Sequence, residues 1–405
     1  MVPFVLALVP VAFTLSLALT GVVVRLSARA GAWDTDAVPG QAKAERRRVP
    51  NTGGIGVFWA IAGPLGLGVA AAWALPAIAP GLIPEAAAAH IDGARDRTPL
   101  ALLALGLAAS VHGLGLIDDR RPLGPRVKLG VLVLPGLVLA TLGGTRLIEA
   151  ADGYVGGAWL SVALTALWFA AVINAMNFID NMDGLCAGVV SVAGAAFLAA
   201  ALLAGQWFVG GVLALVVGAS AGFLVWNFPR ARIFLGDSGS LALGFWLAFL
   251  TVRTTYVGES PAGEPLAGGW YAVLMPLVVL AVPLYDMVAV TAIRLRQGRS
   301  PMVGDLQHVS HRLVKRGLSR RDAVIALWGL TGVTAISGVQ LVRAEAAWVA
   351  LVIGAQVGLL LCVVALLEWS SSPPGAARDS LEPRREPAVL ARGPGDPIGA
   401  GEERP

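Results

Sequence analysis

The 405-residue sequence is short of charged residues and of cysteine. Asp, Glu, Lys and Arg make up 14% of it, and the mean hydropathy is +0.73. A soluble globular protein carries about 25% charged residues, so the composition excludes a separate soluble domain of any size. The two cysteines, Cys186 and Cys362, both lie in apolar runs, which argues against a disulfide framework.

Apolar segments are what the sequence has in abundance. Apolar runs of about 20 residues predict membrane-spanning helices. We therefore predict an all-α, polytopic integral membrane protein with about eleven transmembrane helices. The first run has no charged n-region and no clear cleavage site, so it is predicted to be a retained span. The predicted spans are 2–24, 54–79, 99–117, 128–142, 158–176, 184–204, 208–226, 238–256, 270–293, 323–342 and 347–367.

The distribution of Lys and Arg predicts the orientation of these spans. Alternate loops on one side hold twenty of the thirty basic residues, whereas the loops on the other side hold five. Basic residues accumulate in cytosolic loops, so the N-terminus is predicted outside and the C-terminus in the cytosol. The tail at 369–405, rich in Pro, Gly, Arg and Glu, is predicted to be disordered. The cytosolic loops are 25–53, 118–128, 177–183, 227–237 and 294–322.

Carboxylates gather at helix ends on this predicted cytosolic side. Side chains held this way at the membrane edge repel one another unless a cation neutralises them. Oxygen ligands suit Mg²⁺ or Mn²⁺, and Mg²⁺ commonly binds beside phosphate. Arg and Lys in the same loops suit phosphate as well. The charge pattern therefore predicts a Mg²⁺-dependent site for a diphosphate substrate, built around Asp118, Asp119, Asp180, Asp183 and Asp237.

Each feature alone has a simpler interpretation. An Asp-Asp pair at a helix end is often a solvated cap, and Asp237 before Ser-Gly-Ser suits an N-cap. Two asparagines at a helix end can bond neighbouring membrane helices. Spaced histidines are often surface residues, and a basic loop often contacts anionic lipid. Asp286, inside a predicted span, has no spacing relation to the others and is predicted to be structural or to support the site indirectly. The simple interpretations fail jointly, because the other features share one side of the membrane.

Four ordered motifs resemble the polyprenyl-phosphate N-acetylhexosamine-1-phosphate transferase superfamily, of the glycosyltransferase family 4 type. They are the Asp-Asp pair with a following Lys, the string NAMNFIDNMDGL, the segment NFPRARIFLGD, and a His-x-x-His-Arg-Leu element. VPNTGGIG at 49–56, after Arg46–Arg48, resembles a further segment of that family. The spaced histidines resemble the branch that transfers N-acetylglucosamine phosphate, because the muramoyl-pentapeptide branch carries adjacent histidines. Asp180-Asn181 departs from the usual Asp-Gly but keeps both carboxylates.

The resemblance implies a catalytic domain over residues 1–368 in a bacterial inner membrane. The expected reaction transfers an N-acetylhexosamine-1-phosphate, with N-acetylglucosamine favoured, from a UDP-sugar to undecaprenyl phosphate and releases UMP. Such a step begins assembly of an envelope polysaccharide. The expected partners are these two substrates and membrane lipids, with no nucleic acid, and a homodimer is compatible with the resemblance. Direct attack by the lipid phosphate is favoured over a covalent route through Asp180.

The resemblance also assigns roles to residues. Catalytic roles fall to Asp118, Asp119 and Asp180. The expected ligands of Mg²⁺, or of Mn²⁺, are Asp237, Asp118 and Asp119. Substrate binding falls to Asn174, Asn177, Asp183, Asn227, Phe234, Lys128, His308, His311 and Arg312. Of these, Asp183, Asn227 and Phe234 match family positions that hold the uracil, and Lys128, His308, His311 and Arg312 are expected to clamp phosphates.

Three alternatives remain open from the sequence. The first is a phospho-MurNAc-pentapeptide transferase of the same superfamily. The second is an intramembrane prenyltransferase, which also uses Asp-rich Mg²⁺ sites but has no place for the FLGDSG and His segments. The third is a transporter, which predicts internal repeats and ionisable sites near mid-bilayer.

Overall fold

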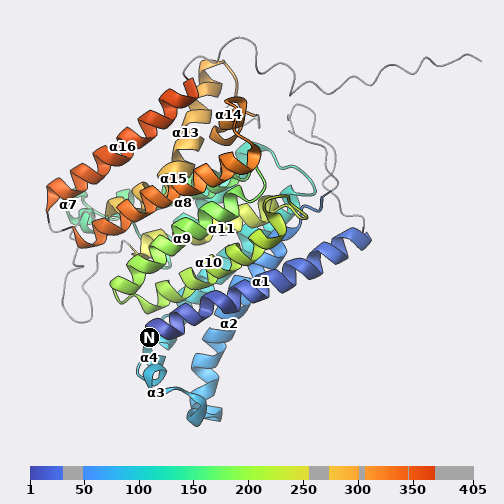
Figure 1. The fold of residues 1–405 in the computed structure, drawn as a ribbon. Helices are drawn as coiled ribbons and strands as arrows, with labels where there is room; N and C mark the ends of the chain where they lie inside the picture. The colour runs from blue at the N-terminus through green and yellow to red at the C-terminus, as the bar shows by residue number, and fades with distance from the viewer. Residues whose placement is uncertain (31–48, 255–272, 301–305, 345, 370–405) are drawn as a thin grey trace, which may run out of the picture. The chain divides into compact units, whose positions relative to one another are not determined.

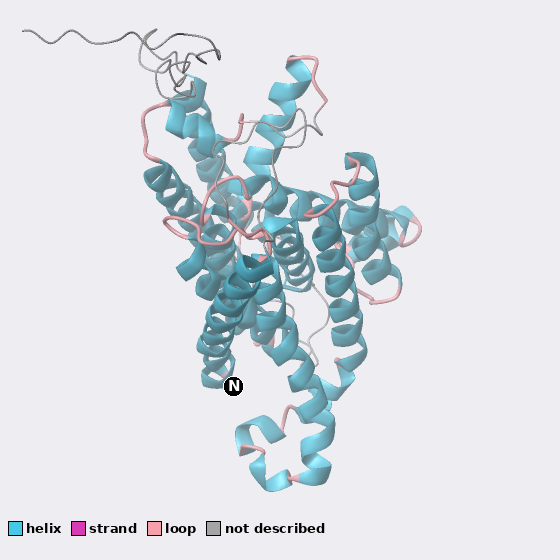
Figure 2. Cartoon of the chain, turned by 90° about the vertical axis from the view of Figure 1, so that its right-hand side faces the viewer, coloured by secondary structure: helices cyan, strands magenta, loops and turns pink. Residues whose placement is uncertain are grey.

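The computed structural model describes residues 1–30, 49–254, 273–300, 306–344 and 346–369. These residues form helices joined by turns, with no strand in the described ranges (Figure 2). The prediction of an all-α protein is confirmed. The α-helices are α1 Val2–Ala30, α2 Gly53–Ile78, α3 Glu85–Ala88, α4 Ile91–Asp96, α5 Thr98–Asp118, α6 Pro125–Thr141, α7 Asp152–Val155, α8 Trp159–Ile179, α9 Leu185–Leu203, α10 Trp207–Asn227, α11 Gly236–Thr254, α12 Met275–Val279, α13 Ala281–Arg296, α14 Val309–Lys315, α15 Arg320–Gln340 and α16 Ala347–Trp369.

Eight helices of the described part are long and apolar enough to cross a membrane: α1, α2, α5, α8, α9, α10, α15 and α16. The chain is therefore a polytopic membrane protein. Three of the predicted spans fall outside this set for separate reasons. Helix α6 is 17 residues long, α11 carries charged and hydroxyl side chains, and the segment 270–293 is divided at Leu280 into α12 and α13. The count of eleven spans and the orientation stay predictions.

Helix α11 lies in the interior of the bundle. It contacts α2, α5, α8, α9 and α10 (Figure 1). All of its nineteen residues are buried except Asp237 and Arg253. Because protein surrounds this helix, its surface does not have to be as apolar as the surface of a helix that faces lipid. This packing explains how a helix of low hydropathy occupies the centre of a membrane protein.

Glycines allow other helices to approach the N-terminal end of α11 closely. A Cβ atom added to Gly115 of α5 would lie 2.4 Å from the backbone of Ser238. A Cβ atom on Gly54 of α2 would lie 2.3 Å from the backbone nitrogen of Gly239. Backbone atoms cannot yield as a flexible side chain can, so these contacts fix the spacing between three helices at one end of α11.

Residues Met1–Glu368 form one compact unit. Apart from its first residue, the predicted disordered tail at 369–405 lies outside the described residues, as do Arg46–Arg48 upstream of the VPNTGGIG segment. The division into a catalytic membrane domain and a tail stays a prediction.

Replacing Gly115 tests the close approach of α5 to α11. We expect Gly115→Ala to lower the free energy of unfolding by about 1–3 kcal/mol, the usual range for overpacking. Gly113→Ala is the matched control, because it lies two residues away in the same helix and an added Cβ meets nothing within 4 Å. The measurement is Tm of the purified protein in detergent. Equal Tm values for the two variants would show that the close contact has no energetic consequence.

Candidate active site

A lysine ammonium joins two carboxylates from separate helices. Lys128, in the first turn of α6, places Nζ 3.0 Å from Oδ2 of Asp118 at the end of α5. The same Nζ also contacts Oδ2 of Asp237, at the start of α11. Residues more than a hundred positions apart are therefore brought together as predicted. The ammonium offsets the repulsion between the two acids.

Asn177 completes this cluster from α8. Its Nδ2 donates to Oδ1 of Asp237 at 2.8 Å and to Oγ of Ser240 at 3.0 Å. Its Oδ1 accepts from Nζ of Lys128 at 3.3 Å. Asn177 is thus the only amide that touches both Asp237 and Lys128 among the described side chains. Asn174, one turn earlier, donates instead to the carbonyl of Ala170 in its own helix, so its predicted substrate contact stays a prediction.

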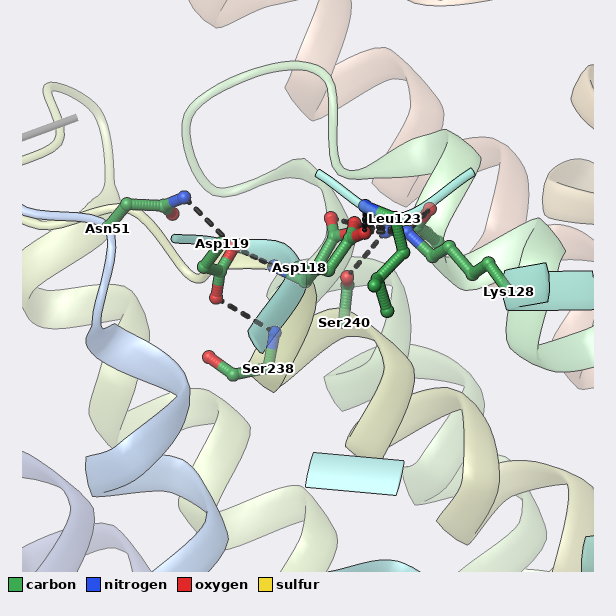
Figure 3. A network of polar contacts seen from close by, with 9 residues as sticks. Asn51, Asp118, Asp119, Leu123, Lys128, Ser238 and Ser240 are labelled. Carbon is green, nitrogen blue, oxygen red and sulfur yellow. Dashed lines mark hydrogen bonds and ion pairs between the residues drawn. The ribbon is translucent and has the colours of Figure 1, made fainter. Parts of the chain in front are cut away.

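Asp119 has a different environment from Asp118. Its carboxylate accepts from the backbone N–H groups of Asp237 at 2.8 Å and Ser238 at 3.1 Å. It also accepts from Nδ2 of Asn51 at 3.0 Å (Figure 3). The first N–H groups of a helix lack partners within that helix, and a carboxylate there is stabilised by the helix dipole. Asp119 therefore caps α11 and fixes the position of Asp237.

Negative charge is concentrated at this place. Partial burial raises the pKa of Asp119 to about 6, and the charge of Asp237 adds to the effect, against the opposing hydrogen bonds from the α11 backbone. Burial also raises the pKa of Asp180 well above its ordinary value, followed by the charges of Asp237, Asp119 and Asp183. The influence of Asp237, Asp119 and Asp183 on Asp180 indicates that these predicted carboxylates lie near one another.

Two of the residues predicted to hold the uracil, Asp183 and Phe234, lie in two loops, and the third, Asn227, is the last residue of α10. Oδ1 of Asn227 accepts from the backbone N–H of Gly184 at 2.7 Å, and its Nδ2 donates to the carbonyl of Ile233 at 2.8 Å. Asp183 accepts from the backbone N–H of Ala231 at 2.8 Å. Phe234, in the same loop as Ala231, is half-buried. Asn227 therefore ties the loops together, and the predicted contacts of these side chains with a nucleobase stay predictions.

The histidine segment begins beside the α8 end. The ring of His308 meets that of Phe178 edge-on, with centroids 5.8 Å apart, and Ser310 donates to Oδ1 of Asn181. Arg312 pairs with Glu368 of α16, at 2.7 Å from Nη2, and also contacts the carbonyl of Gln307. Its guanidinium is thus held by protein groups, and its predicted phosphate contact stays a prediction.

Some residues that shape the site were not found from the sequence. Asn51 and Ser240 contact the carboxylate cluster. Asn51 lies in the VPNTGGIG segment but was given no role of its own, and Ser240 is a single polar residue with no distinctive spacing. Glu368 holds Arg312 from the last helix. Asp286 carried one sequence signal, because it falls in a predicted span, and an acid inside a membrane helix is costly and is usually retained for a function.

The donor set is suited to a hard divalent cation. In the ranges that the structure describes, no group of three His, Cys, Asp or Glu side chains is arranged to hold a metal. Mg²⁺, however, is usually bound by one or two carboxylates together with substrate phosphates, rather than by a cage of protein ligands. Asp237, Asp118 and the amide of Asn177 offer such a partial set of oxygens. The residues therefore fit a site that a phosphate substrate completes.

The fold and the cluster define a class: a polytopic membrane protein with a carboxylate-rich site at the ends of its helices. The model of the family "Glycosyl transferase family 4" matches residues 101–255. This range includes both aspartates of the Asp-Asp pair, Lys128 and Asp237.

Curated relatives agree with this match. A probable undecaprenyl-phosphate N-acetylglucosaminyl 1-phosphate transferase of Bacillus subtilis is 28% identical over 354 residues, which is 85% of this chain and 87% of the relative. The decaprenyl-phosphate N-acetylglucosaminephosphotransferase of Mycobacterium tuberculosis is 32% identical over 78% of this chain and 77% of its own. The undecaprenyl-phosphate alpha-N-acetylglucosaminyl 1-phosphate transferase of Escherichia coli is 30% identical over 56% and 62%.

The chain belongs to glycosyl transferase family 4. The predicted resemblance is confirmed, and these relatives fall in the N-acetylglucosamine branch that the spaced histidines indicated.

Removing the lysine ammonium tests its role in the cluster. We expect Lys128→Met to lower the free energy of unfolding by roughly 2 kcal/mol, because two carboxylates lose their shared cation. The value lies below that for a fully buried pair, since the Asp237 side chain keeps 27% exposure. Arg126→Met, an exposed cation in the same helix, is the control. The measurement is Tm in detergent, and an unchanged Tm for Lys128→Met would contradict the expectation.

The pH dependence of stability tests the environment of His311. Burial, together with the charges of neighbouring cations that include Arg320 and Lys315, lowers the pKa of His311 from 6.5 to about 4. Between these values the unfolded chain binds the proton and the folded chain does not, so stability is lost as the pH falls from 6.5 to 4.

We expect His311→Asn to lose less stability than the wild type across that window. Melting curves at pH 7 and pH 5 measure the difference, with exposed His90→Asn as the control for loss of a histidine. If Tm changed equally between pH 7 and pH 5 in the wild type and in His311→Asn, a lowered pKa of His311 would be excluded.

Proposed function

We propose that this protein transfers N-acetylglucosamine-1-phosphate from UDP-N-acetylglucosamine to a polyprenyl phosphate, undecaprenyl phosphate in particular, and releases UMP. The family and the relatives' names support this choice of substrates over a MurNAc-pentapeptide donor. The observation that carries the proposal is the meeting of Asp118, Asp237 and Asn177 around Lys128. A site of this kind presents both a cation and cation-binding oxygens to a diphosphate.

The reaction joins two anions, so neutralisation of charge is its main requirement. An oxygen of the lipid phosphate attacks the phosphorus next to the sugar, and the bond from that phosphorus to the UMP oxygen breaks. The bond from the sugar C1 to its oxygen is untouched, so the anomeric configuration is retained. The ammonium of Lys128 contacts three acceptors at the site. We propose that it exchanges these contacts for the diphosphate oxygens when the donor binds.

Direct attack is the favoured route. Asp180 is the candidate for a covalent intermediate, but the lipid acceptor can react without one. The lipid phosphate is already an anion, with its second ionisation near pH 6 (on the order of a phosphoester's). Asp118, whose carboxylate faces Lys128, is placed to accept the proton that remains on it.

We further propose that the site binds Mg²⁺, with Mn²⁺ as a substitute. Asp237 is the first candidate ligand, with Asp118 and Asn177 next to it. Asp119 is a weaker candidate ligand than these residues, because its oxygens already accept hydrogen bonds from three protein donors. Bound there, the cation would neutralise the diphosphate and favour departure of UMP.

We place the site on the cytosolic face of a bacterial inner membrane, with eleven spans, the N-terminus outside and the C-terminus in the cytosol. The basic loops support this orientation. A cytosolic site gives access to a nucleotide-sugar, while the prenyl chain of the acceptor stays in the bilayer. A prenyltransferase or a transporter would give no role to the bonded loops around Asp183 and Asn227.

The proposed reaction is tested with purified protein in nanodiscs, radiolabelled UDP-N-acetylglucosamine, undecaprenyl phosphate and Mg²⁺. We expect labelled glycolipid and UMP in equal amounts, with both lost on addition of EDTA. Asp237→Asn should lower the rate by at least about 10²-fold, the scale for loss of one electrostatic group at a reacting centre. Asp92→Asn, an exposed acid in α4, is the control.

Two results would exclude parts of this proposal. Consumption of the UDP-sugar without UMP would exclude the transfer of a sugar phosphate. Full activity of Asp237→Asn would exclude its role as the cation ligand.

A further inference from the structure

Asp286 is a fully buried acid in α13 whose two oxygens are both engaged at the start of the histidine segment. Oδ2 lies 2.7 Å from Nδ1 of His308, and Oδ1 accepts from the backbone N–H of Val309 at 2.6 Å. Its side chain has no exposed surface. Buried carboxylates are costly unless they are paired, and here both oxygens are paired with the segment 22 and 23 residues further along the chain.

The chemistry of these two contacts determines which nitrogen of His308 carries a proton. An ionised carboxylate only accepts hydrogen bonds, so Nδ1 must be the donor to Asp286. The other ring nitrogen, Nε2, is then the one that can meet a substrate. Partners that fix a histidine in this way are widespread at functional sites, where they set both the tautomer and the direction of the ring.

His308 lies beside the segment that supplies the carboxylate cluster. Its ring meets Phe178, the residue between Asn177 and Ile179 at the end of α8. Two residues after His308, Ser310 donates to Asn181, which follows Asp180 directly. The guanidinium of Arg294, also from α13, lies 5.4 Å from the centre of the same Phe178 ring. Helix α13 and the histidine segment therefore both pack against the C-terminal end of α8.

A purely structural role for Asp286 would explain only half of its contacts. Capping the first turn of α14 needs one acceptor for the N–H of Val309, and an amide or hydroxyl would supply it without a buried charge. The second oxygen is directed at the imidazole. That oxygen places a negative charge where it can balance the ring when the ring becomes positively charged beside a bound phosphate.

We propose that Asp286 is a positioning residue for phosphate transfer: it holds His308 with Nδ1 protonated and aims Nε2 at a phosphate oxygen of the bound substrates. With that anion in place, Nε2 carries a proton and donates it in a hydrogen bond, and Asp286 balances the positive charge of the ring. This inference rests on the proposed transfer reaction. The phosphate belongs either to the UDP-sugar or to the lipid, and KM for each substrate distinguishes the two.

A double-mutant cycle tests the inference in the nanodisc assay. Asp286→Asn keeps an acceptor for Val309 but removes the charge opposite the ring, and we expect kcat/KM for the phosphate substrate concerned to fall by about 10- to 100-fold. His308→Gln should have a comparable effect. The double variant should be no worse than His308→Gln, because Asp286 acts through the ring. Asp322→Asn, an exposed acid at the start of α15, is the control.

Losses that multiply in the double variant would overturn the proposal, as would full activity of Asp286→Asn. A fall in Tm alone, with unchanged kinetics, would show a structural role only and would equally overturn it.

A second readout does not depend on activity. The chain has four histidines, so ¹⁵N-histidine labelling gives few signals, and the one that His308→Gln removes is that of His308. We expect Nδ1 protonated in the wild type and Nε2 protonated in neutral Asp286→Asn. The same tautomer in both proteins would overturn the proposal. If the wild type releases no UMP, the transfer reaction fails, and the ¹⁵N signals still decide whether Asp286 sets the tautomer.

Discussion

The rest of the site depends on the contact of one ammonium with two carboxylates. Lys128 lets Asp118 and Asp237 lie together at the end of membrane helices, where like charges would otherwise force them apart. Helices α5, α6 and α11 must therefore end or begin at the same place. Asn177 adds a fourth helix, α8, through hydrogen bonds to both Asp237 and Lys128. Charge compensation and the hydrogen bonds of Asn177 thus hold four helix ends together, and Asp118 and Asp237 already share a cation within the protein.

Packing gives this meeting point its precision. The start of α11 is held by α2 and α5, whose glycines let the backbones approach within contact distance, and by the carboxylate of Asp119. Movement of α11 along its axis would break both sets of contacts. Asp237 is consequently carried on a helix end that is fixed by backbone atoms, which suits a group whose position relative to a reacting phosphorus matters.

The sequence predicted the all-α membrane fold, the family and the set of acids that converge, because hydropathy, positive charge and motif order are all properties of the linear chain. It did not predict which donor meets which acceptor. Asp118 and Asp119 are adjacent and identical in type, yet one faces Lys128 and the other caps α11. The loop bonds of Asn227 and the break at Leu280 likewise arise from packing between segments distant in sequence.

Two kinds of carboxylate can therefore be separated by their partners. Asp119 and Asp286 accept from backbone N–H groups and from a side chain held by the fold, so displacing them would uncap a helix. The carboxylates of Asp118 and Asp237 instead share a flexible lysine that can move to another anion. Acids of the first kind define the shape of the site, and those of the second kind can change partners during a reaction. On the proposed reaction, exchangeable contacts, more than the mere presence of an acid in a motif, therefore mark the groups that would meet the substrate.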